Sequence, residues 1–124
     1  MYMNHWGQHL IMNARRCAPS TIRSKSLIQE FSRVLVKEID MVPYGKPRVV
    51  MFGTGNKKGY TLVQLIETSN ITAHFVEEKN DMYLDVFSCK VFDEKTVRDV
   101  VNHYFYPAGM DSQLIQRDAS FMMQ

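Results

Sequence analysis

Between Tyr60 and Cys89 the sequence reads YTLVQLIETSNITAHFVEEKNDMYLDVFSC. Three runs in this stretch are rich in β-branched and aromatic residues, as strands usually are: Tyr60 to Glu67, Asn70 to Glu77 and Met82 to Cys89. The polar residues Glu78 to Asp81 separate the last two runs and predict a hairpin turn. The stretch therefore predicts successive antiparallel strands.

Two segments with helical periodicity flank these strands. Ser24 to Asp40 repeats apolar residues at helical spacing, at Leu27, Ile28, Phe31, Val34, Leu35 and Ile39. Ser26 followed by Gln29 is a candidate capping box for this helix. Asp93 is predicted to cap a second helix, whose apolar positions are Val97, Val100, Val101, Tyr104 and Phe105. Both helices are predicted to bury one face.

Further strands are predicted at Gln8 to Asn13, Arg48 to Phe52 and Ser112 to Arg117, and Arg15 to Ser20 is predicted to be a loop. The resulting order is β-α-β-β-β-β-α-β. We therefore expect an α+β domain, in which two helices pack on one face of a mostly antiparallel sheet.

Composition limits the class of protein. The chain has 124 residues, 45% of them hydrophobic and 23% charged, which suggests one globular domain, residues 1–124. A net charge of +2 is too small a bias to suggest nucleic acid as the main partner. No apolar run approaches the roughly 20 residues that cross a bilayer, so no membrane partner is expected. Met1 to Leu10 lacks the apolar core of a secretory signal, and we expect a cytoplasmic protein.

Common site motifs are missing or weak. Gly53 to Gly59 is rich in glycine but lacks the spacing of a phosphate-binding loop. His5 and His9 have helical spacing in a segment predicted to be a strand, and nothing completes a ligand set, so no metal is predicted. Cys17 and Cys89 do not make a disulfide framework, and Cys17 is taken as structural.

The predicted hairpin can be given a register. If Glu77 pairs with Met82, His74 lies opposite Asp85 and Asn70 lies opposite Cys89, all on one face. His74 and Cys89 are then about 13 Å apart along the strand, so a direct ion pair is not expected. The residues also have ordinary interpretations: a hydrogen-bonded histidine in a sheet, a buried cysteine and, for Ser69, a loop hydroxyl.

Two motifs resemble the prokaryotic S-adenosylmethionine decarboxylase proenzymes. TSNITAH, from Thr68 to His74, is similar to the family's E-S-H-x-[ST]-x-H, and YLDVFSC, ending at Cys89, is similar to A-x-[VL]-D-[VI]-[FY]-[TS]-C. Gly7 to Ile11, reading GQHLI, is similar to the family's G-x-H-L-[IL]. Thr68 stands where the family has Glu, and Asn70 stands where it has His.

The resemblance implies an enzyme that makes its own pyruvoyl group. Ser69 would attack the preceding carbonyl, and the chain would be cut between Thr68 and Ser69 into a β chain, 1–68, and an α chain, 69–124. The pyruvoyl group formed from Ser69 would capture the substrate amine as a Schiff base. The implied reaction converts S-adenosylmethionine to its decarboxylated form for spermidine biosynthesis. The implied fold is the sandwich of this family, and the implied assembly is a homodimer of processed protomers.

The resemblance also implies residue roles. His74 matches the family's processing histidine, and Thr61 falls where a hydroxyl residue assists processing. Cys89 matches the proton donor, and Glu78 matches the carboxylate that holds the ribose hydroxyls. Candidates for aromatic contact with the cationic substrate are Trp6, Phe52 and Tyr60.

Two alternatives remain open from the sequence. One is a pyruvoyl-dependent decarboxylase that acts on ornithine or arginine. The other is an unprocessed, non-catalytic homologue that binds a nucleoside or regulates a partner. Thr68 and Asn70, which depart from the family pattern, favour the second alternative.

Overall fold

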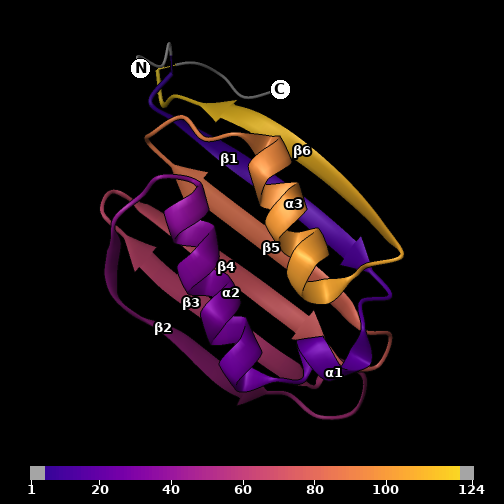
Figure 1. Ribbon diagram of the computed structural model, residues 1–124. Helices are drawn as coiled ribbons and strands as arrows, with labels where there is room; N and C mark the ends of the chain where they lie inside the picture. Colours follow the sequence, from indigo (N-terminus) through magenta and orange to yellow (C-terminus); the bar gives the residue numbers. More distant parts are fainter. Residues whose placement is uncertain (1–4, 121–124) are drawn as a thin grey trace.

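The computed structural model describes residues 5–120 and shows one sheet covered by helices on one face (Figure 1). Six antiparallel strands stand in the order β2-β3-β4-β5-β1-β6. They are β1 (Gly7–Arg15), β2 (Pro43–Phe52), β3 (Gly59–Ile66), β4 (Ser69–Val76), β5 (Asp81–Ser88) and β6 (Gly109–Arg117). The helices are α1 (Pro19–Ile22), α2 (Lys25–Glu38) and α3 (Glu94–Phe105), with a 3-10 turn, η1, at Gly55–Lys57.

The predicted α+β architecture is confirmed, with two short additions. Each predicted strand and both long helices are present. The segment predicted as a loop, Arg15 to Ser20, runs into α1, and the glycine-rich turn contains η1. Neither element is long enough to show a periodic pattern, because α1 has four residues and η1 has three.

The core lies between the sheet and the helices. Phe31 of α2, Phe75 of β4 and Phe105 of α3 are almost fully buried, and Phe105 contacts both of the others, with ring centroids 4.8 and 5.3 Å apart. All five predicted core residues of α3 are buried. In α2, Leu27 and Val34 are only partly buried, at the edge of the apolar stripe.

Helix α2 begins two residues earlier than the candidate capping box suggests. Ser24 is its N-cap, and the Ser24 side chain accepts a hydrogen bond from the Leu27 backbone N–H. The Ser26 cap is therefore wrong: Ser26 lies inside the first turn, exposed, with its hydroxyl beside that of Ser24. Both serines stand near the start of the helix, and the sequence does not distinguish them. Ser24 is the cap because its backbone is still extended, whereas Ser26 already lies inside the helix.

This cap supports a stability prediction. We expect Ser24→Ala to lower the free energy of unfolding by about 1 kcal/mol, because the Leu27 N–H loses its partner. The matched control is Ser26→Ala, for which the expected change is within about 0.5 kcal/mol. Urea unfolding followed by circular dichroism measures both. An equal loss in the two variants would contradict the assignment of the cap.

The predicted register of the β4–β5 hairpin is wrong by two residues. Val76 pairs with Asp81, which places His74 opposite Tyr83, and Thr72, not His74, opposite Asp85. Asn80 adopts a left-handed conformation, with φ of 58°, a conformation that asparagine tolerates, and its carbonyl accepts a bond from the Cys17 N–H. A shift of two residues keeps each side chain on its face, so the apolar pattern fits both registers.

The face of the sheet opposite the helices carries exposed apolar side chains. Val63 and Leu65 of β3 and Tyr83 of β5 are between 38% and 53% exposed, in the middle of the sheet. Strand alternation places His74, Thr61 and Asp85 on this same face, which we call the open face. Large exposed apolar groups on a sheet face are typical of a surface that meets another molecule.

No helix within residues 5–120 is both long and apolar enough to cross a membrane. Residues 1–4, part of the segment in which no secretory signal is expected, lie outside the described residues.

Candidate active site

The predicted cleavage bond lies in a tight turn. Ile66 of β3 pairs with Ser69 of β4, so only Glu67 and Thr68 connect the two strands. Thr68 has φ of 59°, in the left-handed region that β-branched residues avoid. The bond between Thr68 and Ser69 therefore follows a residue whose backbone is strained.

The Thr68 hydroxyl joins the turn to Cys89. Thr68 Oγ1 donates to the Glu67 carbonyl at 2.6 Å and lies 2.8 Å from Cys89 Sγ. The structure thus places Cys89, the predicted proton donor, next to the predicted cleavage bond.

The Ser69 side chain points to the helix-covered face of the sheet, toward Ser88. Ser69 Oγ donates to Ser88 Oγ at 3.0 Å, and Ser88 Oγ also accepts from the Lys90 backbone N–H at 2.8 Å. Ser88 is fully buried beneath the helices. Sequence reasoning missed Ser88, because only the true register sets it opposite Ser69.

A pocket of about 320 Å³ opens at this end of the sheet. Its lining includes Thr68, Ser69 and Cys89, together with residues of the α2–β2 connection. Lys90 closes one side, where its ammonium group donates to the Asp40 carbonyl. Hydrogen bonds link Thr68 to Cys89 and Ser69 to Ser88, and we call these four residues the cleavage cluster.

An aromatic group lies beside the cleavage cluster on the open face. Trp6, 57% exposed, stacks on Phe87 with ring centroids 5.7 Å apart, and the Arg117 guanidinium lies 4.8 Å from the Phe87 ring. Phe87 is the register partner of Asn70, next to Ser69. Through its contact with Phe87, Trp6 lies at the end of the sheet where β4 begins.

The predicted processing residues lie together at the opposite end of the sheet. Thr61 Oγ1 is 3.1 Å from His74 Nδ1, and the two are register partners on β3 and β4. A second pocket, of about 400 Å³, has both residues in its lining, along with the predicted aromatic residues Phe52 and Tyr60. We call Thr61 and His74 the processing pair.

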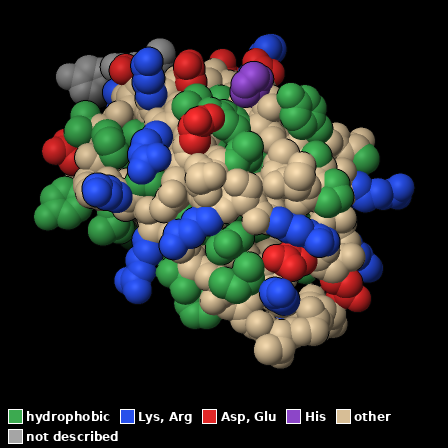
Figure 2. Space-filling view, turned by 60° about the horizontal axis from the view of Figure 1, so that its bottom comes forward, with side chains coloured by type: hydrophobic (Ala, Val, Ile, Leu, Met, Phe, Trp, Pro, Cys, Tyr) green, Lys and Arg blue, Asp and Glu red, His purple; other side chains and the backbone are tan. Residues whose placement is uncertain are grey.

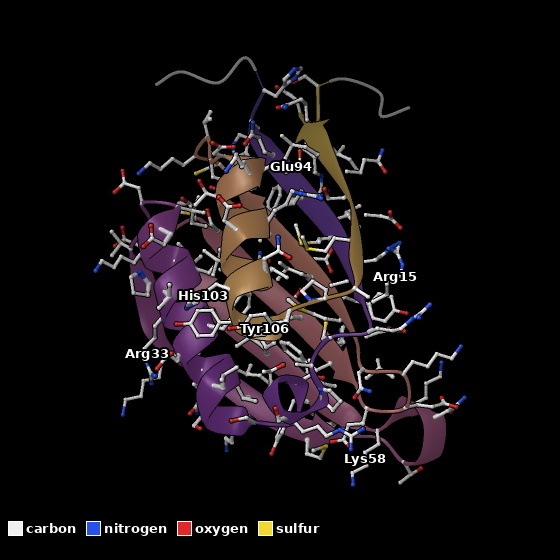
Figure 3. The ribbon with its side chains drawn as sticks, turned by 45° about the vertical axis from the view of Figure 1, so that its right-hand side comes forward. Arg15, Arg33, Lys58, Glu94, His103 and Tyr106 are labelled. Carbon is white, nitrogen blue, oxygen red and sulfur yellow. The ribbon has the colours of Figure 1, made fainter. Side chains whose placement is uncertain are left out.

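Glu78 belongs to the end that carries the processing pair. It is exposed in the turn between β4 and β5, next to Glu77, which lies 3.9 Å from the Lys58 ammonium group. Figure 2 brings this end of the molecule forward and shows Lys and Arg side chains spread across it. Figure 3 shows Lys58 and Glu94 at the two opposite ends of the sheet.

The cleavage cluster and the processing pair cannot meet within one chain. Ser69 and His74 are five residues apart on one strand, about 16 Å at ~3.3 Å per residue. Cys89 is six residues beyond Tyr83, the partner of His74, so the two are about 20 Å apart, more than predicted. In addition, Ser69 faces the helices and His74 faces away from them.

Asp85 has a different partner from the predicted one. The partner of its side chain is on β1, where His9 Nε2 lies 2.9 Å from Asp85 Oδ1. This pair lies between the two ends of the open face. Sequence spacing could not suggest it, because 76 positions separate the two residues.

Other titratable groups are placed away from these clusters. Burial, with a smaller contribution from Asp81, raises the pKa of the Cys17 thiol to about 11, so Cys17 stays protonated at neutral pH. Within residues 5–120 there is no group of three or more His, Cys, Asp or Glu side chains placed to hold a metal ion. Cys17 fits the structural role expected from the sequence.

The sequence matches a known protein family. The model of the S-adenosylmethionine decarboxylase family matches residues 8–118, which include both clusters. The chain belongs to this family. The expectation that the protein is an enzyme, a carboxy-lyase, is thus confirmed at the level of the S-adenosylmethionine decarboxylase family.

A solved structure supports the same fold for this decarboxylase family member. The chain is similar to the crystal structure of the adenosylmethionine decarboxylase from Aquifex aeolicus VF5, with a TM-score of 0.78 and 19% sequence identity. The match covers 98% of each chain. No curated protein matches the sequence. The predicted fold of the family is therefore confirmed over nearly the whole chain.

The strained turn supports a second stability prediction. In an uncut Ser69→Ala background, we expect Thr68→Asn to raise the free energy of unfolding by about 1 kcal/mol, because asparagine tolerates the left-handed conformation. The control is Thr54→Asn, at an exposed residue with φ of −142°, where little change is expected. Urea unfolding measures both. A loss of stability in Thr68→Asn would show that the hydroxyl bonds outweigh the strain.

Proposed function

We propose that this protein decarboxylates S-adenosylmethionine with a pyruvoyl group made from its own Ser69. Self-cleavage between Thr68 and Ser69 gives chains 1–68 and 69–124, and the decarboxylated product serves spermidine biosynthesis. The observation that carries the proposal is the cleavage cluster: a serine directly after a strained turn residue, with a thiol held against that residue.

The residues at the turn fit the formation of this group. The bond to be cut lies between two strands rather than inside one, so β4 keeps its pairing with β5 from Ser69 onward after cleavage. The pocket beside Ser69 and Cys89 leaves room for a substrate at the new chain end. Once formed, a pyruvoyl group supplies a ketone that captures an amine and accepts electrons as carbon dioxide leaves.

Processing needs no external reagent except water. Ser69 Oγ attacks the Thr68 carbonyl carbon, the Thr68–Ser69 amide bond breaks, and the hydroxyl proton is transferred to the Ser69 nitrogen, which leaves an ester. A base then removes the Ser69 α-proton, and the ester oxygen departs with Thr68 as a carboxylate. Water replaces the nitrogen, which is released as ammonia. The step that needs a base is the one proposed for His74.

His74 is suited to this role when Thr61 holds it. In the tautomer whose Nδ1–H donates to Thr61 Oγ1, the Nε2 atom keeps its lone pair and can accept a proton. After decarboxylation, Cys89 returns a proton to the substrate carbon, a role that its position supports because its sulfur lies 2.8 Å from the Thr68 hydroxyl in the cleavage turn. The two residues act at one site only if they come from different chains.

We therefore propose a homodimer in which the open faces of two sheets meet. A two-fold axis that runs between facing sheets, perpendicular to the strands, places β4 of one copy antiparallel over β4 of the other. If the axis crosses β4 between Ile71 and Thr72, midway between Ser69 and His74, it sets His74 of the partner subunit over the Ser69 main chain, where the α-proton is removed, on the face opposite the Ser69 hydroxyl. The exposed Val63, Leu65 and Tyr83 would then be covered.

The same dimer would gather the proposed substrate contacts. Trp6 lies at the cleavage end of its own chain, whereas Phe52, Tyr60 and Glu78 lie at the other end. In the dimer, the last three would come from the partner subunit. Trp6 and Phe52 are then available to hold the adenine between two aromatic faces, and Glu78 to accept the ribose hydroxyls.

Intact mass under denaturing conditions tests the proposal. We expect two fragments that meet at Thr68 and Ser69, the second with a blocked amino terminus that gains mass on borohydride reduction. Release of carbon dioxide from carboxyl-labelled S-adenosylmethionine, but not from labelled ornithine or arginine, would identify the substrate. A chain that stays whole after long incubation would reject the proposal and favour the non-catalytic alternative.

A further inference from the structure

Ser88 is the hydroxyl residue directly before Cys89 in the second motif, at a position to which the sequence analysis gave no role. It is directly opposite Ser69 on one side and Gln8 on the other, with its side chain in the layer between sheet and helices. The Ser69 hydroxyl donates to Ser88 Oγ at 3.0 Å. In the uncut chain, the hydroxyl of Ser69, the proposed nucleophile, is therefore hydrogen-bonded to Ser88.

The Ser88 oxygen is held in place by the backbone. The Lys90 N–H donates to it at 2.8 Å, so that two donors fill the acceptor side of this atom. Lys90 is itself anchored, because its ammonium group donates to the Asp40 carbonyl. An acceptor fixed in this way fixes the rotamer of the side chain that donates to it.

We propose that Ser88 is a positioning residue for self-cleavage, holding Ser69 Oγ in the rotamer from which it attacks the Thr68 carbonyl. This inference rests on the proposed function. The bond directs the Ser69 proton toward Ser88, so the oxygen lone pairs are free to face the carbonyl carbon. Ser88 forms no covalent bond, and the proton still ends on the Ser69 nitrogen. Its effect is confined to the acyl shift, before the ester is eliminated.

Substitution of Ser88 should slow the first step of processing. We expect cleavage of Ser88→Ala to be roughly 10- to 100-fold slower than wild type, because a nucleophile that can leave its attacking position loses rate on this scale. Ser88→Thr keeps the hydroxyl oxygen and should cleave within a few-fold of wild type. Ser88→Cys, which keeps the size but accepts hydrogen bonds poorly, should resemble Ser88→Ala.

The matched control is Ser32→Ala. Ser32, in α2, is the other fully buried serine in residues 5–120, and its hydroxyl donates to Gln64 Oε1 at 3.4 Å, outside the cleavage cluster. It shares the loss of a buried hydroxyl without touching the cleavage cluster. Cleavage of Ser32→Ala should keep the wild-type rate even if its thermal stability falls.

Hydroxylamine distinguishes a role in the acyl shift from a role in the later elimination of the ester, because it cuts esters but not amides. Intact mass is followed over time with and without hydroxylamine. The uncut fraction of Ser88→Ala should resist the reagent, because the acyl shift has not occurred.

Four outcomes would overturn the inference. They are wild-type cleavage by Ser88→Ala, equal slowing in Ser32→Ala, slow cleavage by a folded Ser88→Thr, and a hydroxylamine-sensitive ester accumulating in Ser88→Ala. Failure of the wild-type chain to cleave would instead reject the proposed function, and this inference with it. The two failures are therefore distinguishable from the same set of mass spectra.

Discussion

Ser69→Ala should leave the chain in one piece, with no borohydride-reducible carbonyl and no release of carbon dioxide from S-adenosylmethionine. The variant lacks the oxygen that forms the ester, and the other hydroxyls near the turn cannot replace it. Thr68 Oγ1 is bonded to the Glu67 carbonyl, and Ser88 lies on the neighbouring strand. The expected effect is a loss of processing rather than a reduction in rate.

Intact mass after extended incubation, beside wild type and the exposed control Ser26→Ala, measures this result. The control should cleave as wild type does. The folded state of Ser69→Ala can be confirmed by its urea transition, because removal of one partly buried hydroxyl should cost only about 1 kcal/mol. Cleavage of Ser69→Ala at the same bond would refute the assignment of Ser69.

Co-expression of two inactive variants should restore cleavage. His74→Ala alone should remain largely uncut, and Ser69→Ala cannot be cut. In a mixed dimer, Ser69 of the His74→Ala chain meets intact His74 of the partner subunit. The physical reason is the distance of about 16 Å between Ser69 and His74 along one strand, which neither side chain can span.

The fragment identifies the chain that was cut. Only the His74→Ala chain has Ser69, so the recovered fragment, residues 69–124, must carry the mass of that substitution. With random assembly at equal amounts, about half of these chains join a complementary partner and can be cut. Co-expression with a Ser69→Ala/His74→Ala double variant is the control and should give no cleavage. Mixed dimers that remain uncut would exclude the shared site.

The local patterns of the sequence were sufficient for the elements and their buried faces. Alternating and helical apolar spacing predicted the strands and both long helices, because burial of one face imposes those periods. The five buried residues of α3 are an example. The patterns were less informative at the ends of elements, where Ser24 and Ser26 are chemically equivalent and only the path of the chain selects the cap.

The candidate residues were also predicted from the sequence, but not which of them meet. Ser69, Cys89, Thr61 and His74 were selected by motif spacing. The predicted hairpin already separated His74 from Cys89, but the contacts of Thr68 with Cys89 and of Thr61 with His74 appear only in the structure. The second motif contains Ser88 but does not show that it meets Ser69, because that contact depends on the register of the hairpin.

Residue order by itself determined the α+β class, the family motifs and the apolar faces, because these depend on side-chain type at short, regular intervals. The tertiary structure determined the hairpin register, the left-handed Thr68 and the contacts within the cleavage cluster and the processing pair. These depend on turn geometry and on hydrogen bonds between distant segments, such as Cys17 N–H to the Asn80 carbonyl. A shift of two residues preserves every buried face, so hydrophobicity alone could not select the pairing that sets Ser69 against Ser88.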